Sequence, residues 1–278
     1  MFSIIIPTFN NLIYLKVCIN SLRKNSIFNH QIIPHVNIGD DGTEEYLKSE
    51  EIDYTITKYN SGICEGMNLA AKKANFNYIL YAHDDFYFCP EWDTTLINEV
   101  KKIGHKNFYL SGIMMNNGPL KYNCGNDLSD FNENKLLSNY KDINHYDFQG
   151  STWAPTLVHK EIWNKVGGFS EEFFPGTGSD PDLNMKLWNE NVRIFKGVAL
   201  ARVYHFGSLT TRKNKNIIPN KGKKTFLLKW KVTVEFFTKH ILKRGTEYDG
   251  PISEPKRNFS FYYDLLISKI KYLIAYIS

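Results

Sequence analysis

The sequence predicts an α/β fold with a Rossmann-like, mostly parallel central sheet flanked by helices. Two observations lead to this prediction. Short apolar runs alternate with stretches of helical spacing over the first third of the 278-residue chain, which is the pattern of β-α-β units. Polar, turn-rich loops follow several of the apolar runs, and in open α/β sheets ligands bind at such carboxyl ends of strands.

The first third is predicted to hold four strands and the helices between them. Phe2 to Pro7 is an apolar run typical of a buried strand, and apolar residues at helical spacing then predict a helix that ends near Asn25. The segment Glu65 to Ala74 is rich in helix-forming residues. The further strands predicted here are Ile32 to Ile38, Tyr54 to Thr57 and Tyr78 to Ala82.

The middle of the chain is predicted to be mixed. Apolar periodicity predicts helices over Glu91 to Lys102, Lys160 to Val166 and Asp182 to Glu190. Extended segments are predicted over Phe108 to Met115, Thr152 to His159 and Val192 to Tyr204. Asn116 to Tyr146 is polar with weak periodicity, so we expect a long loop that lies over the site.

Composition narrows the class of protein. Hydrophobic residues at 42% and charged residues at 23% are ordinary for a folded globular chain. The net charge of +5 suits an anionic partner, such as a nucleotide or lipid phosphate, and is too small to indicate nucleic acid. The four cysteines form no CxxC pair, which argues against a zinc site or a disulfide framework and favours a reducing compartment.

The chain beyond Pro219 is predicted to be helical and basic. The last segment, Phe259 to Ser278, has a broad apolar face that Lys269 and Lys271 interrupt, so it does not read as a membrane span. Two alternatives remain for this face. It packs back onto the domain, or it lies against a membrane surface or a partner helix.

Three short motifs carry side chains suited to catalysis. His83-Asp84-Asp85 follows a predicted strand, and its adjacent carboxylates would be relieved of repulsion by a divalent cation, Mg²⁺ or Mn²⁺. Turn formation is the alternative explanation for such a pair. Asp180 opens a predicted helix, where it would serve equally well as an N-cap before Pro181. His205 ends an extended run and, taken alone, indicates nothing specific.

In combination, these motifs resemble those of the family-2 glycosyltransferases with the GT-A fold, over roughly residues 1 to 210. The shared pieces occur in order along the chain, and it is this joint occurrence that carries the resemblance. They are SIIIPTFN, IGDDGT, NSGICEGMNLA, YILYAHDDFYFCPEW, KEIWNKVGGFSEEF, GSDPDLNMKLW and YHFGS. The resemblance implies a GT-A domain over 1–215, with a nucleotide-sugar half (1–115), an acceptor half (116–215, including the loop 116–147) and a helical basic extension (216–278).

The resemblance also implies roles for individual residues. Asp180 would be the catalytic base, and Ser179 stands where the family usually has Glu. Asp85 would bind the metal with His205 and His83, although His83 replaces the first Asp of the family's DxD motif. The residues implied to bind the nucleotide sugar are Pro7, Thr8, Asn10, Asp40, Asn68 and Asp84.

The implied activity is inverting transfer of a sugar from a nucleotide-diphosphate sugar, UDP favoured, to a hydroxyl of a glycan or glycolipid. Surface polysaccharide or lipopolysaccharide assembly at the cytoplasmic face of the membrane is the expected setting. Two rivals remain at this stage. One is a catalytically silent module that binds nucleotide sugars or glycans. The other is a nucleotidyltransferase, which would need a glycine-rich basic loop where Pro7 to Asn10 stands.

Overall fold

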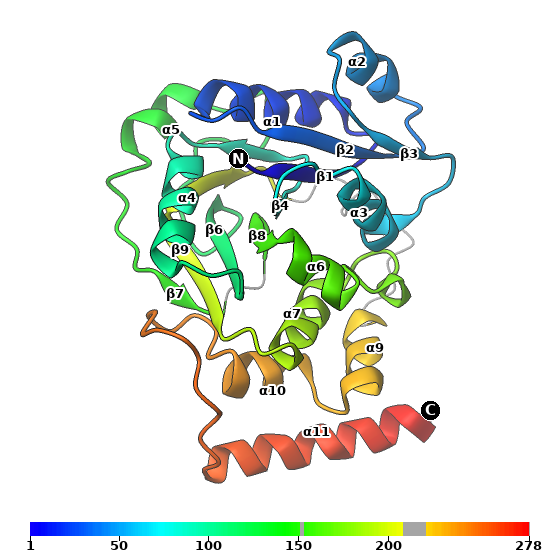
Figure 1. Ribbon diagram of the computed structural model, residues 1–278, viewed down its shortest axis with the longest axis vertical. Coiled ribbons are helices and arrows are strands. Elements are labelled where there is room, and N and C mark those ends of the chain that lie inside the picture. The colour runs from blue at the N-terminus through cyan, green and yellow to red at the C-terminus, as the bar shows by residue number, and fades with distance from the viewer. Residues whose placement is uncertain (151–152, 208–220, 278) are drawn as a thin grey trace.

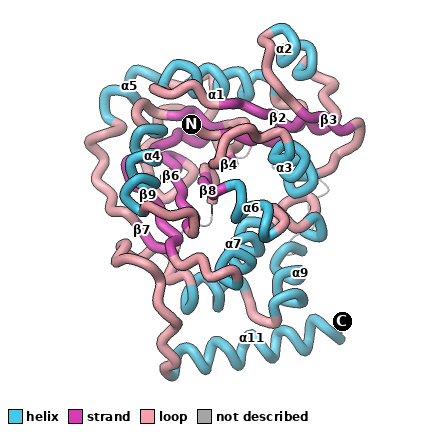
Figure 2. Tube along the Cα trace, in the orientation of Figure 1, coloured by secondary structure: helices cyan, strands magenta, loops and turns pink. Residues whose placement is uncertain are grey.

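A nine-stranded sheet forms the centre of the computed structural model, which describes residues 1–150, 153–207 and 221–277. The strand order is β3-β2-β1-β4-β8-β6-β9-β5, and β7 pairs with β9. Six strands run in one direction and β5, β7 and β8 run in the other. The prediction of a mostly parallel sheet flanked by helices is therefore confirmed (Figures 1 and 2).

The amino-terminal half is a run of β-α-β units. Its strands are parallel neighbours: β1 (Ser3–Phe9), β2 (Gln31–Asn37), β3 (Thr55–Thr57) and β4 (Tyr78–Tyr81). The connecting helices are α1 (Leu12–Asn25), α2 (Thr43–Ser49) and α3 (Gly62–Lys72), and α1 and α3 lie on opposite sides of β1 and β2 (Figure 1). Because β1 has β2 on one side and β4 on the other, strand order reverses there, and a crevice forms at the carboxyl ends.

Strand β1 continues two residues beyond its expected end at Pro7. Its pairing with β4 covers only Ser3 to Ile5, whereas its pairing with β2 extends to Phe9. A proline lacks the N–H that a central strand uses for pairing. Pro7 lies beyond the part of β1 that needs bonds on both sides, so the strand can extend to the rim of the crevice.

The second half of the sheet is mixed in direction. Antiparallel β8 (Thr156–His159) lies between β4 and β6 (Phe108–Asn116), and β9 (Ile194–His205) runs parallel to β6. The two short strands β5 (Phe86–Phe88) and β7 (Phe148–Gln149) pair antiparallel with β9. The helices of this half are α4 (Trp92–Ile103), α6 (Lys160–Val166) and α7 (Ser179–Asn189).

The segment expected to be a long loop, 116–147, contains the helix α5 (Glu133–Asn139). Asn132 caps this helix by accepting a hydrogen bond from the Lys135 N–H at 2.8 Å. Leu136 and Tyr140 are buried in a small apolar cluster that includes Tyr204. The segment is thus packed against the end of the sheet, and its few apolar anchors are too irregularly spaced to show periodicity.

The C-terminal extension forms α9 (Lys221–Trp230), α10 (Val234–Phe236), a π-helical turn (Phe237–Ile241) and α11 (Phe259–Ile277). Helix α11 lies along one end of the molecule (Figure 1). Of its residues only Phe261 and Ser268 are buried, so most of the predicted apolar face remains exposed. No helix within the described ranges has the length and apolar character needed to cross a membrane.

Candidate active site

Loops from three neighbouring strands meet at the crevice beside β1. Thr8 is buried at the end of β1, Pro7 is half-buried, and Asn10 follows in a left-handed backbone conformation with φ of 46°. The Asn10 side chain accepts a hydrogen bond from the backbone N–H of Asp40 at 3.0 Å. This bond ties the β1 and β2 loops together and leaves the Asp40 side chain exposed at the rim.

Asn68 is engaged elsewhere. Its amide nitrogen donates to the Phe169 carbonyl at 2.8 Å, and its amide oxygen accepts from the Phe169 N–H at 2.9 Å. The side chain therefore fastens α3 to the loop that precedes α7. This pairing gives Asn68 a positioning role, and the nucleotide contact that the resemblance implied stays a prediction.

His83, Asp85 and His205 form a compact cluster. Each offers one possible ligand atom, and these atoms all lie within 4.8 Å of one another. The β5–β9 pairing explains the encounter, since Phe86, which follows Asp85, lies opposite His205 in the register. His205 Nε2 lies 3.4 Å from Asp85 Oδ2.

The hydrogen bonding of His205 indicates what belongs in this cluster. Its Nδ1 lies 3.0 Å from the Asn117 carbonyl, which can only accept, so Nδ1 carries a proton. The lone pair of Nε2 then faces the Asp85 carboxylate, and a proton or a metal ion between them would relieve the repulsion of the two electron-rich groups. Backbone carbonyls orient metal-binding histidines in this way. Burial lowers the pKa of His83 to about 4, which keeps its imidazole neutral and able to ligate. Two imidazole nitrogens and a carboxylate suit Mn²⁺ better than Mg²⁺, which prefers oxygen ligands only.

Asp84 has a different environment from its neighbour Asp85. It is buried beside the side chains of Thr8 and Asn11. Burial, and then the charge of Asp85, raise the pKa of Asp84 to about 7, while Thr8 and Asn11 oppose the rise. The two carboxylates of the pair are therefore not equivalent, because only Asp85 belongs to the histidine cluster.

Asp180 lies in the first turn of α7. The helix begins at Ser179, three residues before the expected start at Asp182, and Gly178 precedes it in a left-handed conformation with φ of 86°. The expectation that Asp180 caps the helix is therefore wrong. Its Oδ1 atom is buried and has no hydrogen bond to any residue that the structure describes. Burial raises the pKa of Asp180 to about 7, and the positive charge of Arg244 opposes that rise.

Asp182, two residues further on, shows the opposite arrangement. It is fully buried, accepts hydrogen bonds from Ser170 at 2.6 Å and from the Trp230 indole at 2.8 Å, and pairs with Lys229 at 2.9 Å. These contacts fasten α7 to α9. Of the two carboxylates in this motif, Asp182 is thus engaged by neighbouring side chains, whereas Asp180 Oδ1 has no hydrogen-bond partner among the described residues.

Tyr81 connects the two parts of the site. Its hydroxyl lies 3.1 Å from His83 Nε2. Burial raises the pKa of Tyr81 well above its usual value, and the charges of Asp180 and Asp84 add to the rise. Both carboxylates therefore lie within electrostatic range of one side chain at the end of β4, so the histidine cluster and Asp180 belong to one region.

Three residues of this region were not expected from the sequence: Arg244, Trp153 and Asn117. The Arg244 guanidinium stacks on the Trp153 ring, 3.5 Å from its centroid. In the sequence Arg244 is one of many basic residues of the extension, and nothing in that pattern distinguishes it. Asn117 contacts His205 twice, through its own carbonyl and through its side-chain amide, which donates to the His205 carbonyl at 3.2 Å.

Comparison with known proteins gives one family. The profile described as "Glycosyl transferase family 2" matches residues 3–154, which is more than half of the chain. The matched range includes the histidine-carboxylate motif of β4 and stops before Asp180 and His205. No curated protein sequence matches the chain.

Similar solved structures share the fold. The crystal structure of S. aureus TarS 1–349 aligns with a TM-score of 0.61 at 14% identity, covering 99% of this chain and 72% of that one. The same TarS fragment in complex with UDP-GlcNAc aligns at 0.58 and 16% identity, with coverages of 85% and 66%. GalNAc-T7 with UDP, GalNAc and Mn²⁺ aligns at 0.58 and 13% identity, with coverages of 74% and 43%.

Proposed function

This chain belongs to glycosyl transferase family 2 and has the GT-A fold, and from that premise we propose that it is an inverting glycosyltransferase. It transfers a sugar from a nucleoside-diphosphate sugar to a hydroxyl of a glycan or glycolipid. The observation that carries this proposal is the pairing of a buried, proton-accepting Asp180 with a separate cluster of His83, Asp85 and His205.

In the proposed reaction, the acceptor oxygen forms a bond to the anomeric carbon as the bond from that carbon to the diphosphate oxygen breaks. The electron pair of the broken bond leaves with the diphosphate, and the proton of the hydroxyl goes to Asp180. A carboxylate whose pKa is about 7 is a stronger base than an ordinary one, and it is still ionised in half or more of the molecules at neutral pH. General base catalysis of this kind is worth about 10²- to 10⁴-fold in rate.

The proposed donor site lies along the crevice beside β1. Pro7, Thr8 and Asn10 line the nucleotide, Asp40 at the exposed rim contacts the base, and Asp84 lies near the ribose or sugar. The fold that the chain shares with TarS in complex with UDP-GlcNAc supports a UDP-sugar. His83, Asp85 and His205 would hold the divalent cation, Mn²⁺ before Mg²⁺, and a cation there would neutralise charge on the departing diphosphate.

The extension adds a proposed membrane contact. Residues 221–277 carry twelve Lys and Arg against five Asp and Glu, out of 34 and 29 in the whole chain, so the positive excess is concentrated here. The side of α11 that faces away from Phe261 and Ser268 exposes Phe259, Tyr262, Tyr263, Leu266, Ile270, Leu273, Ile274 and Ile277. An apolar helix face within a basic segment suits the anionic surface of a membrane. A location at the cytoplasmic face, in surface polysaccharide or lipopolysaccharide assembly, agrees with this arrangement.

The test is a screen of UDP and UDP-sugars with Mn²⁺, first by thermal shift and then by release of UDP in the presence of glycan acceptors. Stabilisation followed by UDP release is the expected result. Binding without any turnover in the wild-type protein would favour the rival, a silent nucleotide-sugar or glycan-binding module. Absence of binding to any nucleotide diphosphate would remove the proposal altogether.

A further inference from the structure

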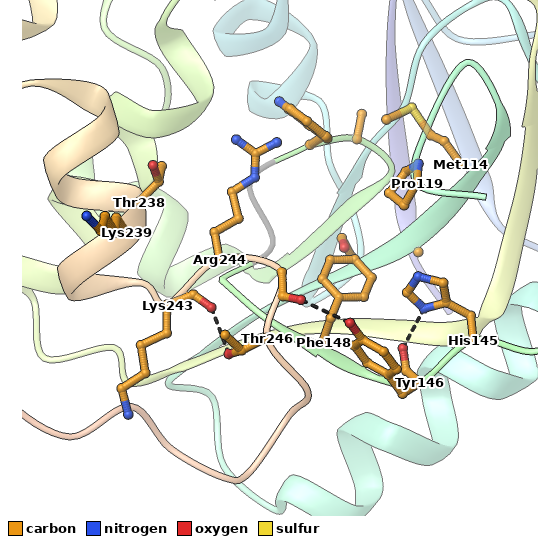
Figure 3. A pocket seen from close by; sticks show the side chains of 15 residues that line it. Met114, Pro119, His145, Tyr146, Phe148, Thr238, Lys239, Lys243, Arg244 and Thr246 are labelled. Carbon is orange, nitrogen blue, oxygen red and sulfur yellow. Dashed lines mark hydrogen bonds between the residues drawn. The ribbon is translucent and has the colours of Figure 1, made fainter. Parts of the chain in front are cut away.

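A cavity of about 610 Å³ opens beside Arg244, whose charge acts on the candidate base Asp180. It lies between β6, β7 and the turn that follows the π-helical segment, and Figure 3 shows Arg244 on one side with Met114, Pro119 and His145 on the other. This volume is in the range of sites that bind small ligands. The cation-binding cluster of His83, Asp85 and His205 does not line it, so the cavity is separate from the proposed diphosphate position.

Arg244 joins this cavity to the reaction centre. Its side chain lines the cavity, and its positive charge acts on Asp180. Strand β6 gives a second connection. Burial raises the pKa of Tyr109, and the charge of Asp180 adds to the rise. Ser111 lies two residues further along the same face of the strand and lines the cavity. Asp180 is not among the described lining residues, so Arg244 and this face of β6 are what connect the cavity to it.

The charge of the cavity is positive. Its described lining includes Lys239, Lys243 and Arg244 and contains no Asp or Glu. The amino group of Lys239 is paired with Asp264 at 2.7 Å, and the Lys243 side chain extends away from the cavity (Figure 3). Arg244 is thus the cation available to a ligand among the described lining residues.

Arg244 is half-buried and has unused hydrogen-bonding capacity. Its guanidinium stacks on Trp153, and among the described residues no hydrogen bond or ion pair involves its side-chain nitrogens. Burial lowers the pKa of Arg244, and the charge of Asp180 opposes this. A guanidinium presents N–H groups in a planar fork that matches phosphate or carboxylate oxygens.

The turn that carries Arg244 is held rigidly. The Gln149 N–H donates to the Thr246 carbonyl at 2.8 Å, and the Gly245 N–H donates to the Gln149 carbonyl at 3.0 Å. The Tyr146 hydroxyl donates to the Gly245 carbonyl at 3.2 Å. These bonds fix the turn to β7, so Arg244 is oriented before any ligand arrives, which lowers the entropic cost of binding.

From this geometry we propose that the cavity is the acceptor subsite and that it takes an acceptor carrying an anionic group, a phosphate or a carboxylate, close to the hydroxyl that receives the sugar. The inference rests on the proposed glycosyltransferase function and specifies its acceptor. Arg244 binds the anionic group, and the aromatic side chains of Tyr146, Phe148 and Trp153 give flat apolar surfaces for the carbon skeleton. In this proposal the hydroxyl extends from the cavity past Arg244 toward Asp180.

The test uses two matched pairs of small probes with the full chain. Methyl glucuronoside is compared with methyl glucoside, and glycerol 3-phosphate with glycerol, by calorimetry at fixed ionic strength. We expect each charged probe that fits to bind about tenfold or more tightly than its neutral partner. The carboxylate and phosphate pairs distinguish the two kinds of acceptor.

Two variants locate the binding. Arg244→Gln should remove the preference for charged probes, and Arg244→Lys should retain part of it. Lys256→Gln removes the same charge from the same extension at an exposed residue outside the cavity lining, and it should behave as wild type. Equal binding of charged and neutral probes, or an unchanged preference in Arg244→Gln, would overturn the inference.

UDP affinity separates this inference from the proposed function. If Arg244→Gln weakens UDP binding as much as probe binding, Arg244 serves the donor and the acceptor subsite is wrong. If UDP-sugars are turned over without any preference for charged acceptors, this inference fails and the proposed function stands. If charged probes bind through Arg244 while UDP-sugars neither bind nor react, the proposed function fails and the anion site remains without its acceptor role.

Discussion

Replacing Asp180 with asparagine should make the protein more stable and inactive at the same time. Burial raises the pKa of Asp180 from its ordinary value of 3.8 to about 7, so the folded protein binds this proton more tightly than the unfolded chain does. The contribution of Asp180 to stability is therefore greatest below the unfolded pKa and is lost as the pH rises through the folded pKa. A shift of about three units corresponds to about 4 kcal/mol, and the neutral asparagine avoids this cost.

The matched control is Asp182→Asn, two residues further along the same helix. Its carboxylate is fully paired with Ser170, Trp230 and Lys229, so the substitution should cost about 1.5–3 kcal/mol, the value of hydrogen bonds to a charged group. Urea denaturation near pH 5 and near pH 8 measures both variants. We expect Asp180→Asn to exceed wild type by the larger margin near pH 8 and by a smaller margin near pH 5, because at pH 5 Asp180 is protonated in the folded protein but still ionised in most unfolded chains.

Activity completes the comparison. Transfer by Asp180→Asn should fall about 10²- to 10⁴-fold while UDP binding persists, since the substitution keeps the shape of the side chain. In the wild type, kcat/KM should fall as the pH drops below about 7. Turnover by Asp180→Asn near the wild-type rate would refute the assignment of the base. Destabilisation near pH 8, as in Asp182→Asn, would show that the carboxylate of Asp180 is compensated in the folded protein.

Three further predictions concern the metal, the Arg244 turn and α11. Asp85→Ala should remove most of the gain in UDP affinity that Mn²⁺ provides, whereas Asp40→Ala should weaken UDP binding with or without Mn²⁺. Both affinities are measured by calorimetry, and a full Mn²⁺ effect in Asp85→Ala would exclude Asp85 from the metal site. Gly150→Ala should lower both stability and the preference for charged acceptors, because the new Cβ would lie 2.5 Å from the Leu242 carbonyl oxygen and 2.8 Å from Arg244 Cα. Gly167→Ala is the control, since Gly167 has a similar positive φ and an added Cβ there would meet no atom within 4 Å. Equal losses in both variants would implicate backbone conformation alone. The double variant Leu266→Glu with Ile270→Glu should abolish sedimentation of the protein with anionic lipid vesicles. Ile13→Glu is the control, because it alters an exposed apolar residue on α1 and should leave sedimentation unchanged. Retained sedimentation of the double variant, or a change in its oligomeric state instead, would contradict a membrane contact.

The sequence was sufficient for the parts of the fold that depend on local pattern. Strands β1 and β4 each centre on a run of apolar residues, and α1 ends at Asn25 as its periodicity predicts. Helix α5 was missed because its burial depends on Leu136 meeting Tyr204 from a distant strand. Strand β5 was missed for a similar reason, since its three residues become a strand only by pairing with β9.

The candidate site divides along the same line. His83, Asp85 and Asp180 belong to short sequence motifs, so the sequence alone could identify them as candidates. The contact between Asp85 and His205 depends on the β5–β9 register, which no motif encodes. The distinction between Asp180 and Asp182 was beyond the sequence, because both are acidic residues in one helical turn. It depends on which carboxylate finds Lys229 and Trp230 on α9.

The C-terminal extension therefore affects the electrostatics and the packing of the candidate site. The residue that opposes the raised pKa of Asp180 is Arg244, and the side chains that hold Asp182, and with it the start of α7, come from α9. The turn that carries Arg244 is fixed to β7 by backbone hydrogen bonds. Because α7 presents Asp180 while α9 anchors its first turn, a change in how the extension packs would alter both the position and the basicity of that carboxylate. A membrane contact through α11 would act on the same extension, and it would thereby connect the lipid surface to the proposed catalytic base.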